Sequence, residues 1–347
     1  MNKTWIFNFF NSLSQYTLLP TIFDLIILIP SLFLYLIELI LILLYKKTFF
    51  KSSFFKLFVA RTISSIFELI FQFFYLRFGR FGFFLSFYLA LPNIYLNFIY
   101  LFFVYFIYVE CLLTTTLLLN RLTSLIWPLK YEKLWKKLWY LIIIIILIIP
   151  LPLSCNILFL NIFILLHSND SSFTLYAPDD TNTLFITCLF SIFISIFCFI
   201  INIGCLYVYK KKTIVNIAQT ENKQKMENKL TIYSILTFLG QFLNSIYLII
   251  LYFVGYQLVN FGINTELIDV IFITVFNQNS WVNDINTITI PAFLLFWASE
   301  KIRNNVYKII KINNQKINNK TIMVIPKQQT FTTQMVVIER KIFNKRK

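Results

Sequence analysis

Seven long apolar runs follow one another along this sequence, and each is long enough to cross a lipid bilayer as a helix. A membrane-spanning helix needs about 20 mostly apolar residues. Backbone groups inside a bilayer have no water to bind, so the choice is helices or a closed barrel, and runs of this length favour helices. The runs are Thr21–Tyr45, Phe54–Leu76, Pro92–Leu119, Trp139–Leu166, Thr183–Tyr209, Leu230–Tyr256 and Leu267–Trp297. The sequence therefore predicts an all-α membrane protein, a bundle of seven transmembrane helices.

The composition also indicates a membrane protein. Hydrophobic residues make up 58% of the 347 residues and charged residues 13%, and the mean hydropathy is +0.73. Soluble domains contain about 45 to 50% apolar residues, so this chain is too apolar for that class.

The net charge of +16 is distributed by loop, which predicts an orientation. Of the 31 lysines and arginines, 27 follow the first, third, fifth or seventh run. Lys3, Arg77 and Arg80 are assigned to the other side, and Arg61 lies inside the second run. The positive-inside rule makes the basic loops and the C-terminus cytoplasmic and the N-terminus extracellular. Because the charge is spread over alternate loops, it does not indicate a nucleic-acid-binding patch.

The bundle is expected to be flanked by two kinds of terminal segment. Residues 1–20 form an extracellular N-terminus without signal-peptide features, and residues 21–297 form the bundle. Residues 298–312 place isoleucines and valine on one helical face and lysines on the other, which predicts a cytoplasmic amphipathic helix. Residues 313–347 are predicted to be a flexible basic tail.

Several residue types limit the chemistry. Asn2 and Asn169 begin Asn-x-Ser/Thr triplets on the predicted outer face, so they are candidate glycan acceptors. All five cysteines fall inside the runs, which predicts neither an outer disulfide nor a metal site. The one histidine, His167, falls in an outer loop. Without a recognisable nucleophile-base pair or phosphate-binding glycine loop, we expect neither an enzyme nor a bound cofactor.

Ionisable residues within a membrane are costly, so those inside the runs are functional candidates. The second run carries a polar stripe with members three or four residues apart, namely Arg61, Ser65, Glu68 and Gln72. One hypothesis pairs Arg61 with Glu68 inside the bundle; the alternative is that Arg61 reaches the inner headgroups. Glu110, near mid-membrane in the third run, is either a structural hydrogen-bonding group or the floor of a ligand pocket.

The seventh run is the most polar. Asn277, Asp284 and Pro291 recur every seven residues and share a face, with Asn283 and Thr287 beside them. Such a helix must line a cavity or a hydrated polar network, and Pro291 is predicted to kink it. A transport path would need the same residues, so this feature does not separate a receptor from a transporter.

The end of the third run carries a motif. Asn120 and Arg121 are followed by Leu125, Pro128 and Tyr131, in the register in which rhodopsin-like receptors continue after Asp-Arg-Tyr. The whole pattern, "NR.TS...P..YEK.W", resembles the nematode serpentine chemoreceptors, most closely serpentine receptor class gamma. A second block after the seventh run is also similar to that family, through Leu294, Leu295, Ser299, Ile302 and Arg303.

This resemblance implies a chemosensory G protein-coupled receptor of the plasma membrane, with a small-molecule ligand and a heterotrimeric G protein as partners. It implies coupling roles for Asn120, Arg121, Leu125, Pro128 and Tyr131, in which Arg121 meets the G protein and Leu125 and Pro128 shape the second inner loop. The alternative is that Arg121 is only a positive boundary residue. Because Asn120 replaces the usual aspartate, the carboxylate that restrains the arginine in rhodopsin-like receptors is missing.

The ligand is expected in an outer-half cavity formed by the third, fifth, sixth and seventh runs. Aromatic residues there, including Tyr95, Tyr100, Phe103 and Tyr105, would favour an apolar or aromatic ligand, or else they only pack. The main rival function is a ligand-gated channel or small-molecule transporter, in which the seventh run and the Arg61/Glu68 stripe form the path. An intracellular N-terminus would favour the channel.

Overall fold

The computed structural model describes residues 3–15, 18–46, 50, 52–166, 172–177, 180–215 and 221–307. Among these residues, six helices are long and apolar enough to cross a membrane, at 19–44, 53–80, 93–126, 131–159, 181–211 and 228–261. The chain is thus a mainly helical membrane protein, as predicted. The candidate glycan acceptors Asn2 and Asn169, together with His167 and the tail 313–347, lie outside the described residues.

The long helices match the first six predicted runs but differ at their ends. They are α2 (Leu18–Leu44), α3 (Ser53–Gln72), α6 (Asn93–Ile126), α7 (Tyr131–Ile148), α9 (Thr181–Val215) and α10 (Glu221–Tyr252). Three of them continue through short helical turns: α3 into η1 (Phe73–Arg77) and α4 (Phe78–Arg80), α7 into α8 (Pro150–Ser154) and η2 (Cys155–Phe159), and α10 into η3 (Phe253–Gln257) and η4 (Leu258–Phe261). The extension of α3 carries polar side chains into the bundle.

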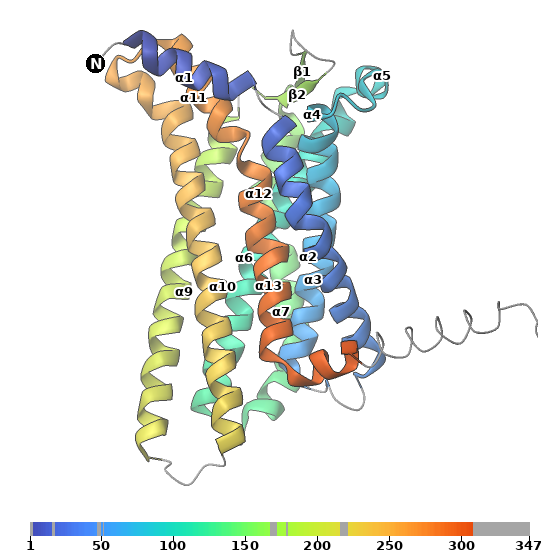
Figure 1. Ribbon diagram of the computed structural model, residues 1–347, viewed down its shortest axis with the longest axis vertical. Coiled ribbons are helices and arrows are strands. Elements are labelled where there is room, and N and C mark those ends of the chain that lie inside the picture. The colour runs from blue at the N-terminus through green and yellow to red at the C-terminus, as the bar shows by residue number, and fades with distance from the viewer. Residues whose placement is uncertain are drawn as a thin grey trace, which may run out of the picture. The chain divides into compact units, whose positions relative to one another are not determined.

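The seventh predicted run is divided into four pieces. These are α11 (Thr265–Phe276), α12 (Asn279–Asp284), the π-helix η5 (Ile285–Thr289) and α13 (Ile290–Ala298). Pro291 lies two residues after the end of the π-helix at Thr289. Proline has no N–H to continue α-helical bonding, so the preceding turn widens. The predicted irregularity at Pro291 therefore takes the form of a π-helix. The lower pieces run beside α2 and α10 (Figure 1).

The end of the bundle that carries α1 contains structure that the sequence did not predict. Helix α1 (Lys3–Gln15) lies across α11 (Figure 1). The strands β1 (Phe163–Leu166) and β2 (Phe173–Tyr176) form an antiparallel hairpin. The prediction that one helix continues to Leu166 was wrong, since the helical turns end at Phe159 and aromatic and β-branched residues then favour strands. A side chain at Gly79 would collide with the backbone of β2, so this contact requires glycine.

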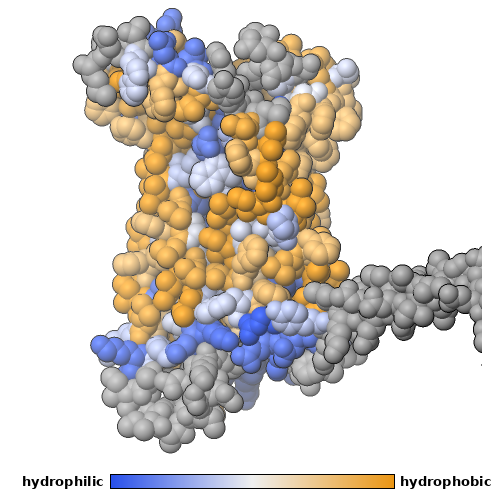
Figure 2. Space-filling model, in the orientation of Figure 1, coloured by the Kyte–Doolittle hydropathy of each residue, from blue (hydrophilic) through white to orange (hydrophobic). Residues whose placement is uncertain are grey.

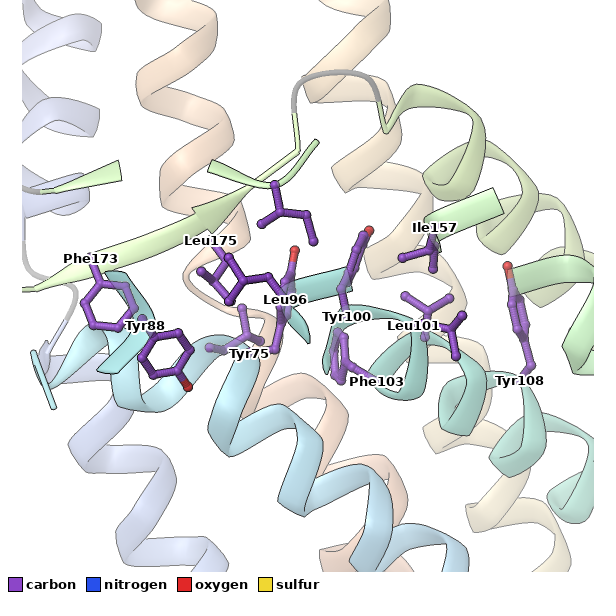
Figure 3. Packing of buried hydrophobic residues seen from close by; sticks show 13 residues of the cluster. Tyr75, Tyr88, Leu96, Tyr100, Leu101, Phe103, Tyr108, Ile157, Phe173 and Leu175 are labelled. Carbon is purple, nitrogen blue, oxygen red and sulfur yellow. The ribbon is translucent and has the colours of Figure 1, made fainter. Parts of the chain in front are cut away.

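Helix α6 is at the centre of the bundle and packs against α3, α7, α9 and α10. Its N-terminal half contributes to an aromatic-rich core with η1, α5 (Leu85–Ala90) and β2, shown in Figure 3. Around the bundle, Figure 2 shows a broad hydrophobic belt that ends in a hydrophilic band at the end opposite α1. This is the surface expected of a helical bundle in a bilayer.

Residues 300–347 form a separate unit, of which residues 300–307 are described and helical. The amphipathic helix predicted at 298–312 begins later than expected, because α13 ends at Ala298 and Ser299 has an extended backbone. The rest of that helix lies outside the described residues.

Candidate functional site

Arg61 and Glu110 form a buried ion pair between α3 and α6. Arg61 Nε lies 2.5 Å from Glu110 Oε1, and Ser65 Oγ donates to Glu110 Oε2 at 3.1 Å. The prediction that Arg61 pairs with Glu68 was wrong. Those residues are two turns apart on one helix, about 10 Å along its axis, whereas Glu110 faces Arg61 from the next helix. Arg61 is also 0% exposed, so the headgroup alternative was wrong too.

Glu68 instead contacts the seventh segment. Asn283 Nδ2 donates to Glu68 Oε1 at 2.7 Å, and Gln72 Nε2 donates to the Ser280 carbonyl at 3.4 Å. Arg61 reaches the same segment through the Asn286 carbonyl, at 3.3 Å. The predicted polar stripe on α3 thus faces the bundle interior and binds two neighbours, α6 and the α12–η5 segment.

Arg77 forms the second buried ion cluster, and sequence analysis misplaced it in an outer loop. Its Nη2 donates to Asp24 Oδ2 of α2 at 2.5 Å and to Asp284 Oδ2 of α12. The guanidinium carbon lies 4.6 Å from the centre of the Phe73 ring. Arg80, also assigned to that loop, is buried and donates to Ser280 Oγ at 3.0 Å. Both arginines therefore belong to the bundle interior and do not count as outer-loop charges.

Two buried polar residues stand apart from these pairs. Glu38 of α2, which sequence analysis did not single out, is 0% exposed. In the described part of the chain, neither of its carboxylate oxygens has a hydrogen-bond partner. Asn277, predicted as part of the network, lies at the break between α11 and α12, and its Nδ2 likewise bonds to none of the described residues. The network thus joins four of its five predicted residues to neighbouring helices and leaves Asn277 outside.

At the other end of α6, two hydrogen bonds hold the start of α7 against it. Tyr131 donates its hydroxyl proton to Asn120 Oδ1 at 3.0 Å. Trp135 Nε1 donates to Thr123 Oγ1 at 2.7 Å. These four residues are the Asn, Thr, Tyr and Trp of the motif, so its spacing matches a clamp that folds the connecting loop back on α6.

Arg121 bridges α6 and α10. Its Nη2 donates to Thr231 Oγ1 at 3.3 Å, and the side chain is partly exposed at the basic end of the bundle. Leu125 is buried, whereas Pro128 is exposed on the loop between α6 and α7. The five residues expected to couple thus lie together at one end, two of them on the surface and three tied into the helices.

The predicted aromatic residues mostly pack into the core rather than line a cavity. Tyr75 stacks on Tyr100 and Phe103 with ring centres 4.6 and 5.2 Å apart (Figure 3). Tyr105 is buried, while Tyr95 is 55% exposed on the outside. Tyr100 also donates to Asp180, just before α9. Burial raises the pKa of the Asp180 carboxyl to about 6, against the hydrogen bonds from Thr183 and Tyr100 that lower it.

A cavity of about 310 Å³ lies elsewhere, between α2 and the α12–η5 segment. Asp24 and Asp284 contribute to its lining, so it adjoins the Arg77 cluster. It lies between the first and seventh runs, whereas the ligand was expected in a cavity formed by the third, fifth, sixth and seventh runs. The lining residues are Leu19, Pro20, Phe23, Asp24, Ile27, Gln278, Trp281, Asp284, Ile285 and Thr289.

Comparison with known proteins identifies the family. No curated protein matches the chain, but the family model described as Srg family chemoreceptor matches residues 21–306. That match covers all seven predicted runs and both motif blocks, so the resemblance inferred from the sequence is confirmed. This chain belongs to the Srg family of chemoreceptors, serpentine receptor class gamma.

Proposed function

We propose that this chemoreceptor binds a small molecule between its membrane-spanning helices and activates a heterotrimeric G protein at its basic end. The observation that carries the proposal is the hydrogen bond between Arg121 and Thr231, which joins α6 to α10. It lies at the basic end of the bundle, where the Arg121 side chain is partly exposed. Opening of such a contact would free both the arginine and a groove between the two helices. A ligand can shift this equilibrium only if it binds the open form more tightly than the closed form.

The charge distribution supports an orientation with the Arg121 end in the cytoplasm. Lysines of three connections, including Lys46, Lys133 and Lys211, are exposed at the end that bears Arg121. Because Arg77 and Arg80 are buried, they no longer oppose this asymmetry. By the positive-inside rule, the N-terminus then lies outside, and the α11–α13 segment is the seventh crossing.

The clamp between α6 and α7 supports a docking role for the loop that it closes. With Tyr131 and Trp135 bound to α6, residues 127–130, which connect α6 to α7, project from the bundle and are exposed. A surface that is fixed before binding costs less entropy to dock. Asn120 is bound by Tyr131 in this arrangement, so the residue that replaces the usual aspartate positions the loop.

A channel or transporter would use the intramembrane charges as an ion or substrate path. Here Arg61 and Arg77 are buried and paired with carboxylates of other helices. Paired and desolvated charges serve better to hold helices together than to conduct. The pairing of these charges therefore favours a receptor over a channel or transporter.

The test uses basal coupling and needs no ligand. Thr231→Ala, Arg121→Ala and the double variant are expressed at equal surface level with a panel of Gα subunits, and G protein dissociation is measured by resonance energy transfer. Thr231→Ala should raise basal coupling, and adding Arg121→Ala should abolish the increase. Lys133→Ala, an exposed charge in the same region, is the control. Full activity of the double variant would contradict the proposed role of Arg121.

A further inference from the structure

The cavity between α2 and α12–η5 has apolar walls and a carboxylate floor. Phe23 and Ile27 of α2 face Trp281 and Ile285 of the seventh segment across it. Figure 2 shows a pale and blue area that interrupts the hydrophobic belt in its upper half, beside α12. The lining residues place the cavity where the first and seventh membrane segments meet.

The floor is polar and negatively charged. Asp284 is 2% exposed, and its Oδ1 has no hydrogen-bond partner in the described part of the chain. Arg77 binds the other oxygen, Oδ2, and also Asp24. Neither Arg77 nor any lysine is among the described lining residues, and the charged groups among them are the two carboxylates. A buried carboxylate oxygen without a donor is costly and favours a ligand that supplies one.

We infer that this cavity binds a small amphipathic molecule with an apolar body and an amine head group that donates to Asp284. The inference rests on the proposed function, which calls for a ligand within the helices, and it specifies the class of that ligand. A protonated amine supplies the hydrogen-bond donor that Asp284 Oδ1 lacks, and its charge is opposite to that of the two lining carboxylates. The volume of about 310 Å³ is at the lower end of small-molecule sites, which suits a short alkyl or aromatic amine.

The site is placed to affect the bundle. Asp284 is the last residue before the π-helix η5, and Thr289 at its end also lines the cavity. π-Helical turns are common at functional sites. An amine bound to Asp284 would compete with Arg77 for that carboxylate and so weaken the link between the second and seventh segments.

The test measures binding directly, in receptor reconstituted into phosphatidylcholine nanodiscs. An alkylamine bearing a photoreactive diazirine is irradiated with the receptor, and the labelled residues are mapped by mass spectrometry. Labels should fall on the lining residues, and octylamine should compete whereas octanoate should not. Ile27→Trp, which fills the cavity without touching the carboxylates, should reduce labelling about tenfold. Ile26→Trp, at a neighbouring position that is 62% exposed to the outside and not part of the lining, is the matched control.

A second arm distinguishes the source of the amine. If the head group of a membrane lipid occupies the cavity, phosphatidylethanolamine added to the nanodiscs should reduce the labelling. If the ligand is a free amine, octylamine should reduce the labelling and phosphatidylethanolamine should not. Equal labelling of Ile27→Trp and Ile26→Trp, or octanoate competing as well as octylamine, would overturn the inference. Because no signalling is measured, a failure of G protein coupling leaves this test intact.

Discussion

Arg61 of α3 and Glu110 of α6 lie 2.5 Å apart with both side chains buried, and they tie the second span to the central helix of the bundle. Charges in such a place are tolerated because each is the partner of the other. Removing one partner leaves the other as an unpaired buried charge, which lowers the free energy of unfolding.

Glu110→Gln should therefore destabilise the bundle by about 3 to 5 kcal/mol, the usual cost of breaking a buried pair. Glu38→Gln is the matched control, since it makes the same chemical change at a carboxylate that has no partner in the described part of the chain. It should leave stability unchanged or raise it. Thermal unfolding in nanodiscs, followed by intrinsic fluorescence, measures both. Equal melting temperatures for the two variants would contradict the assigned pairing.

Substitutions of the two aspartates that bind Arg77 should have non-additive effects on the free energy of unfolding. One guanidinium binds two carboxylates, so Asp24→Asn or Asp284→Asn alone leaves it paired. The double variant leaves a buried cation without a counterion. We expect about 1 kcal/mol for each single change and about 3 to 5 kcal/mol for the double. A double-variant effect equal to the sum of the two single effects would show that Arg77 has another counterion.

Stability should depend on pH through Asp180. Its folded pKa is raised from 3.8 to about 6 by burial, so the folded state prefers the protonated carboxyl. This contribution is fully present below the unfolded pKa and is lost as the pH rises through about 6. It amounts to up to about 3 kcal/mol, from about 1.4 kcal/mol per pKa unit. Melting temperatures measured across this window should fall more steeply for the native chain than for Asp180→Asn; parallel curves would contradict the assignment.

The clamp on the loop between α6 and α7 can be loosened without disturbing the core. Tyr131→Phe removes the hydrogen bond to Asn120 and should cost about 0.5 to 1.5 kcal/mol. The loss should be local, so amide hydrogen exchange should speed up at Trp127, Leu129 and Lys130 and remain unchanged in α9. Lys136→Ala, an exposed change on the same helix, should have neither effect. Uniform exchange in all three proteins would show that Tyr131 does not hold the loop.

The spans themselves were predictable because they depend on the length and hydrophobicity of local segments. The ion-pair partners were not predictable. Arg61 pairs with Glu110 and not with Glu68 because of how α3 and α6, two helices far apart in sequence, pack together. Arg77 and Arg80 were misplaced because charge counting assigns any arginine between runs to a loop. A local signal was present, since a phenylalanine directly follows each of the two arginines. The strand β1 was not predicted, because the apolar run that contains it is compatible with a buried helix as well as with a strand.

The cavity could not have been found from the sequence. Its lining comes from α2 and from the broken seventh segment, and only the packing of the two brings Asp24 beside Asp284. The motif at the end of α6 was easier to recognise, because Asn120, Thr123, Tyr131 and Trp135 lie within sixteen consecutive residues and contact one another across a single loop.

Coupling to a G protein requires that Arg121 lie on the cytoplasmic side of the membrane. The direct measurement is to place an epitope tag at each end of the chain and to ask which tag an antibody reaches on intact cells. We predict that the N-terminal tag is accessible and that the C-terminal tag is reached only after permeabilisation. An accessible C-terminal tag with a hidden N-terminal tag would place Arg121 outside the cell, contradict coupling to a G protein and favour a channel.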